Sequence, residues 1–143
     1  MVRVIHADLE LFLTGWLRDA LAARSEPYAQ GVVVDSSEPD PTQDFPERLI
    51  VIRSDGGPAL SWITDEIAIG VTVFAGTKAL PQDAIDLARL ARALLNDCAA
   101  VEPGNPVAQV RESNGPYRII EEQQRARLYM TFVMVVAGTA LAE

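Results

Sequence analysis

The chain has few residues of the kinds that hold metal ions or form covalent cross-links. Its 143 residues include one cysteine, Cys98, and one histidine, His6. A structural zinc site needs about four such ligands and a disulfide needs two thiols, so a single chain can supply neither. Any metal would have to bind through oxygen ligands, and we expect neither a metal site nor a cofactor. We expect Cys98 to be a buried small apolar residue.

Targeting and membrane-spanning segments are also lacking. His6, Asp8 and Glu10 stand where a signal peptide requires an uninterrupted apolar run. The most apolar stretch, residues 128–141, is shorter than the roughly 20 residues that a helix needs to span a bilayer. These features predict a protein with no membrane segment that is made in the cytoplasm.

Sequence motifs of catalysis are missing as well. A serine–histidine pair would have to use His6, and no serine lies in a G-x-S-x-G pattern. Residues 70–78 resemble a phosphate-binding P-loop, but five residues separate the two glycines, where four are needed, and Thr77 precedes Lys78. We therefore expect no catalytic residues and no enzymatic activity.

Positive charge is scarce. Twelve Lys and Arg residues stand against twenty Asp and Glu residues, which gives a formal net charge of −8. A chain of this charge repels the phosphate backbone of nucleic acids and anionic membrane surfaces. Arg118, Arg125 and Arg127 form a small basic cluster, which fits an acidic protein neighbour as well as DNA.

Apolar periodicity is present in two segments and predicts two main helices. The first runs from Asp8, as its N-cap, to about Arg24, and the second follows Pro81 and carries a stripe of alanines and leucines. In the first helix the predicted inner stripe is Leu9, Phe12, Leu13, Trp16 and Ala20. Leu17 and Leu21 widen the apolar face of this helix. A wide face favours either a helix sunk in the core of its own chain or a helix that also contacts another chain.

An acidic segment, Asp35–Glu47, separates a short strand from the next one. It holds five acids, three prolines and no basic residue. Proline removes backbone donors, so this segment cannot lie inside a sheet. Its acids do not have the spacing of an EF-hand. We expect a solvated loop that a partner orders.

Alternating apolar residues predict several strands. Residues 48–53 and 66–74 form an antiparallel pair, and residues 107–112 and 117–121 form a hairpin around a turn at 114–116. A last strand spans residues 125–140, with one apolar face throughout and a second half covered on both faces. The order of elements predicts a single domain of α+β class, with two main helices on one face of a largely antiparallel sheet.

These features together resemble a known family. An N-terminal amphipathic helix precedes an acidic, proline-rich loop, a strand pair ending in DEIAIGVTVFAGTK, an Ala/Leu helix and a long strand RARLYMTFVMVVAGT. In size and element order the chain resembles the tail terminator proteins of long-tailed bacteriophages, above all those of phages that infect actinobacteria.

The resemblance implies a structural virion protein in the neck of the tail. Such a protein forms a homo-oligomeric ring of six copies on the tail tube, stops addition of the tail tube protein and meets the head-tail connector protein. Genome DNA only passes through the lumen, which six acidic copies would make repulsive to DNA. Two rivals remain open: another ring protein of the head-tail connector, and a small-molecule-binding α+β module.

A closed ring requires two different complementary surfaces on each copy. The candidates for contact between copies are Leu17 and Leu21 on the first helix and Arg127 and Tyr129 on the last strand. The candidates for contact with tube or connector are the acidic segment, through Asp35, Asp40, Asp44 and Phe45, and the predicted hairpin tip, through Arg118.

Overall fold

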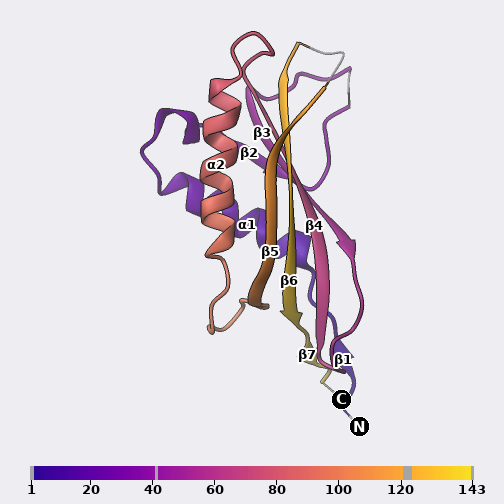
Figure 1. Ribbon diagram of the computed structural model, residues 1–143. Helices are drawn as coiled ribbons and strands as arrows, with labels where there is room; N and C mark the ends of the chain where they lie inside the picture. The colour runs from indigo at the N-terminus through magenta and orange to yellow at the C-terminus, as the bar shows by residue number, and fades with distance from the viewer. Residues whose placement is uncertain (1, 41, 121–123, 143) are drawn as a thin grey trace.

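The computed structural model describes residues 2–40, 42–120 and 124–142, and it has an α+β fold (Figure 1). The elements in chain order are β1 (Val4–Ile5), α1 (Leu9–Ala22), a 3₁₀ helix (Pro27–Ala29), β2 (Val33–Asp35), β3 (Arg48–Gly56), β4 (Thr64–Ala75), α2 (Gln82–Asn96), β5 (Val107–Ile119), β6 (Ala126–Ala137) and β7 (Thr139–Ala140). Five strands form one sheet in the order β2-β3-β4-β6-β5, and β1 pairs with β7. The predicted class is confirmed.

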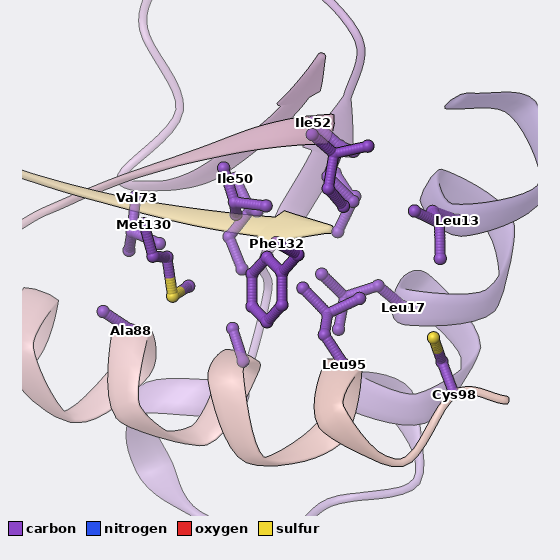
Figure 2. Close-up of a cluster of buried hydrophobic side chains, with 14 of the residues drawn as sticks. Leu13, Leu17, Ile50, Ile52, Val73, Ala88, Leu95, Cys98, Met130 and Phe132 are labelled. Atoms are coloured by element: carbon purple, nitrogen blue, oxygen red, sulfur yellow. The ribbon is translucent and has the colours of Figure 1, made fainter. Parts of the chain in front are cut away.

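Both main helices pack against the same face of the five-stranded sheet. Contacts link α1 to β2 and β3, and α2 to β4, β5 and β6. Apolar side chains from both helices and from three central strands meet in this layer, as Figure 2 shows for Leu17, Leu95, Ile50 and Phe132. Each of these four side chains is buried. The hydrophobic core therefore lies between the helices and the sheet.

The first helix begins where the sequence predicts, but its buried face differs from the prediction. The Asp8 side chain accepts a hydrogen bond from the Leu11 backbone N–H at 3.1 Å, as an N-cap does. Leu17 and Leu21, predicted to face another chain, are buried in the core with Leu9 and Leu13. The prediction of Leu17 and Leu21 as interface residues is wrong. The apolar face of α1 is wide. Leu17 and Leu21 follow Leu9 and Leu13 at intervals of four residues, so all four lie on the same side of the helix, near the middle of that face.

The strand β5 is continuous where the sequence predicts a hairpin. Residues Val107–Ile119 pair antiparallel with β6 along their whole length, and Gly115 and Pro116 lie at a register shift between Asn114 and Tyr117. Residues 113–116 are held from α2 by Arg92, which donates to the Ser113 side chain at 2.9 Å and to the carbonyls of Ser113 and Gly115. The predicted hairpin is therefore wrong. The residues before and after the predicted turn both pair with β6, so the turn residues form a β-bulge within one strand. The return arm's Glu121 lies outside the described residues.

The long strand β6 alternates along its whole length. Leu128, Met130, Phe132, Met134 and Val136 are buried under the helices, as predicted. The opposite face is half-buried throughout, including Val133 and Val135. The prediction that the second half is covered on both faces is wrong, because the two helices lie on one side of the sheet only.

The acidic segment Asp35–Glu47 connects two parallel neighbours. β2 pairs parallel with β3, with Val34 opposite Ile50, and parallel neighbours require a crossover connection. The helices occupy one face of the sheet, and residues of the segment contact the other face, which we call the outer face. The length of this loop thus follows from the topology.

Candidate interaction surfaces

The outer face of the sheet carries a hollow of about 400 Å³ that contains Arg127 and Tyr129. Arg127 lies 3.3 Å from a carboxylate oxygen of Glu38, in the acidic segment. The Tyr129 ring lies across Gly70, where a Cβ atom added to the glycine would come within 2.3 Å of the phenol oxygen. Glycine at position 70 therefore allows the close approach of the tyrosine. Both predicted residues lie on the outer face, within reach of the chain's own acidic segment.

An aromatic contact fastens the end of the acidic segment to this outer face. The rings of Phe45 and Phe74 meet edge to face, with centroids 5.1 Å apart. The Arg125 guanidinium stacks on Phe45 at 3.9 Å and donates to the carbonyls of Pro46 and Glu47. Phe45, predicted to contact a tube or connector, thus contacts its own sheet and is half-buried.

The carboxylates of the acidic segment remain at the surface. Asp35, Asp40 and Asp44 are all exposed, as predicted for a solvated loop. Their contact with a tube or connector stays a prediction. Asp40 accepts hydrogen bonds from the Thr42 backbone and hydroxyl, which lower the pKa of its carboxyl group. Asp44 and Glu47 have no cationic nitrogen of the described residues within 4.0 Å.

A groove on the helix side of β5 gathers three arginines in the described part of the chain. It has a volume of about 580 Å³ and lies between α2 and the free edge of β5. Its lining consists of Ile85, Arg89, Arg92, Ala93, Asn96, Pro116, Arg118 and Leu128. We call it the basic groove. It contains the predicted residue Arg118, which is exposed on β5 instead of at a hairpin tip.

Exposed apolar side chains gather at the two ends of the sheet. At the terminal end, where Thr64 pairs with Ala137, the group is Val2, Ile5, Leu60, Trp62 and Leu141. At the loop end, where Ala75 pairs with Ala126, the group is Leu80, Ile119 and Ile120. Both chain termini lie at the first of these ends (Figure 1). Neither group was predicted from the sequence, because its members are not regularly spaced; Trp62, which lies beside a turn and outside any apolar pattern, is the one signal in the sequence for the first group.

Cys98 is buried, as predicted, and its environment makes the thiol unreactive. The residue is 1% exposed, and burial raises the pKa of the thiol from 9.0 to about 11. Because the thiolate is the reactive form, we expect disulfide reagents at neutral pH to modify Cys98 at least about a hundredfold more slowly in the folded chain than in urea. Equal rates in the two conditions would contradict this burial.

The titration of Cys98 also predicts a pH dependence of stability. The folded pKa lies above the unfolded one, so the buried neutral thiol stabilises the fold fully below pH 9.0. That contribution falls as the pH rises toward 11. A Cys98→Ala variant should lack this part of the alkaline decline in urea-unfolding midpoints.

Other chemical features of the described residues are sparse. No group of three or more His, Cys, Asp or Glu residues in the described ranges is arranged to hold a metal ion. The carboxyl groups with shifted pKa values are those of Glu26 and Asp40, both lowered by hydrogen bonds at the surface, to Arg24 and Thr42. Within residues 2–40, 42–120 and 124–142, no helix is long and apolar enough to cross a membrane.

Comparison with known protein families finds no match for the chain, and comparison with curated proteins finds none either. The functional assignment therefore depends on the surfaces of the fold. They are the outer face with its acidic segment, the basic groove and the two apolar ends. Of the predicted site residues, Arg127 and Tyr129 lie together with Glu38 on the outer face, and Arg118 lines the basic groove on the helix side. Arg118 and Arg127 also line one hollow at the loop end of the sheet.

Proposed function

We propose that this protein is a structural component of the tail of a long-tailed bacteriophage. It forms a ring on the end of the tail tube, stops addition of further tube subunits and joins the tail to the head connector. Its partners are copies of itself, the tail tube protein and the connector protein, and genome DNA passes through the lumen. The proposal rests on the family resemblance of the sequence and on how the surfaces of the fold are distributed.

The observation that carries the proposal is the pair of apolar groups at opposite ends of the sheet. Strand β4, which joins the two ends, has 12 residues and is therefore about 40 Å long. Trp62 is 61% exposed at the terminal end, and Ile120 is fully exposed at the loop end. Exposed apolar groups of this kind mark contact sites. A ring between tube and connector needs two such sites, facing opposite ways along its axis.

The two edges of the sheet support lateral assembly. The sheet ends in the three-residue strand β2 on one side and the 13-residue strand β5 on the other. These edges differ in length, direction of pairing and charge, so a contact between them is heterologous. Heterologous contacts generate closed rings when the rotation between copies closes.

Electron microscopy of tubes grown from the tail tube protein encoded beside this gene tests the proposal. Adding the protein should give tubes of arrested length with a ring at one end. Tubes that keep growing with bare ends would remove the capping function. In that case, a ring found on the connector instead would assign the protein to the connector.

Variants of the two ends should separate the two docking functions. We expect Trp62→Asp and Ile120→Asp each to weaken one contact, tube or connector, because a charge in a desolvated contact leaves an unpaired ion. The protein concentration needed for the affected contact should rise about tenfold or more. Capping is read by microscopy, and connector binding by co-sedimentation.

The matched control for both variants is Val101→Asp. Val101 is fully exposed and belongs to neither apolar group, so this variant should cap tubes and bind the connector like the unaltered chain. If both end variants cap tubes and bind the connector normally, the apolar ends are not docking sites and the proposal loses its main support.

A further inference from the structure

The basic groove combines an apolar floor with guanidinium groups at its rim. Ile85, Ala93 and Leu128 supply apolar lining, and Arg89, Arg92 and Arg118 supply the charge. Arg92 is half-buried and already holds the bulge of β5. Arg89 and Arg118 are exposed, and the nearest carboxylate oxygen to Arg89 is that of Asp86 at 3.8 Å. In a chain of net charge −8, this concentration of cations predicts an acidic occupant.

The chain itself supplies a segment of matching chemistry. The acidic segment Asp35–Glu47 has five carboxylates and no basic residue. Asp44 and Glu47 are exposed, and the Phe45 between them is fastened to the outer face. The segment is therefore held in place while its carboxylates remain at the surface. Its prolines and its anchored aromatic ring reduce the conformational entropy lost on binding.

The acidic segment and the basic groove lie on opposite faces of the sheet. The segment contacts Phe74 and Arg127 on the outer face. The groove opens on the helix side, between α2 and β5. Within one chain Asp44 and Glu47 form no ion pair with Arg89 or Arg118 of the described residues, so these carboxylates are available to a second copy.

We propose that the basic groove of one copy binds the acidic segment of the next copy around the ring. Arg89 and Arg118 face Asp44 and Glu47 of the neighbour across this contact. Every copy then uses one groove and one acidic segment, and closure leaves neither unpaired, as a heterologous ring requires. The inference rests on the proposed ring, and it assigns the surfaces that meet in it.

Two charge-reversed chains test the contact. The groove variant carries Arg89→Glu and Arg118→Glu, and the segment variant carries Asp44→Arg and Glu47→Arg. Each alone sets like charges against each other, so we expect the midpoint concentration of assembly to rise about a hundredfold. Light scattering and native mass spectrometry measure the mass of the assembly. An Arg3→Glu, Arg24→Glu chain has the same net charge as the groove variant, away from the groove, and should assemble normally.

Mixing the two variants gives the decisive result. In an alternating ring the acidic groove of the groove variant meets the basic segment of the segment variant, and the unaltered groove of the segment variant meets the unaltered acidic segment of the groove variant. Opposite charges therefore meet at every contact, so an equimolar mixture should recover assembly that neither variant reaches alone. A single chain with all four substitutions pairs opposite charges at every contact and should recover the mass of the unaltered ring. Recovery also proves that the substituted chains are folded, because an unfolded chain could not restore assembly.

Three results would overturn the inference. The variants could assemble like the unaltered chain, the chain with all four substitutions could fail to recover assembly, or the unaltered chain could stay monomeric at millimolar concentration while capping tubes. Binding of a DNA duplex that the groove variant loses, with assembly unchanged, would assign the groove to nucleic acid instead. None of these results removes tube capping, which microscopy measures separately, so failure of the contact and failure of the proposed function remain distinguishable.

Discussion

Replacing Phe132 with alanine is expected to lower the free energy of unfolding by about 4 kcal/mol. Phe132 lies opposite Ile69 in the β4–β6 ladder and is 1% exposed. Its ring points from the centre of the sheet toward α2, where it packs in the main core cluster (Figure 2). Truncation removes the largest fully buried side chain of the described residues. It leaves a cavity that the surrounding helices and sheet cannot fill by moving inward.

Urea unfolding followed by circular dichroism measures this loss. The matched control is Trp62→Ala, which removes a larger aromatic side chain that is 61% exposed. We expect this variant to change the free energy of unfolding of the unassembled chain by less than about 0.5 kcal/mol. A similar loss in both variants would mean that burial does not decide the effect, and that Phe132 is not at the centre of the core.

The second large effect is expected at Leu17, which the sequence pattern leaves open between a place in the core and a contact between copies. Leu17 has no exposed surface and packs with Leu13 and Leu21 in the main core cluster. We expect Leu17→Ala to lower the free energy of unfolding by about 3 kcal/mol. The loss should be independent of protein concentration, because the contacts of Leu17 lie within one chain.

Leu11→Ala on the same helix provides the comparison. Leu11 is 72% exposed, so the same truncation should cost less than about 0.5 kcal/mol. If Leu17→Ala instead left the unassembled chain stable and weakened assembly, Leu17 would be an interface residue and its place in the core would be wrong.

Elements with a strong local signal could be predicted from the sequence. The Asp8 cap, the antiparallel pair of β3 and β4, and the Ala/Leu stripe of α2 all follow from capping chemistry and periodicity. The stripe that the periodicity predicts is Ala84, Leu87, Ala88, Ala91, Leu94, Leu95 and Cys98, and all of these residues are buried except Leu94, which is half-buried. These features depend on residues within a few positions of one another, so a single segment contains the information.

Features that depend on a neighbouring element could not be predicted. Asn114, Gly115 and Pro116 are typical turn residues, yet they form a bulge because β6 continues alongside them. The half-exposed outer face of β6 follows from the placement of both helices on the other side. Local propensity does not depend on the neighbouring strand or helix. In both cases that neighbour determines the conformation or the burial of the residues.

The candidate surfaces divide in the same way. The sequence by itself determined the acidic segment, the charge balance and the apolar face of β6, because these are properties of consecutive or regularly spaced residues. Only the tertiary structure decided that Arg89 and Arg118 share a groove and that the acidic segment crosses the outer face. The physical reason is that α2 and β5 come together only by packing on one sheet, and the sheet then separates the basic groove from the acidic segment.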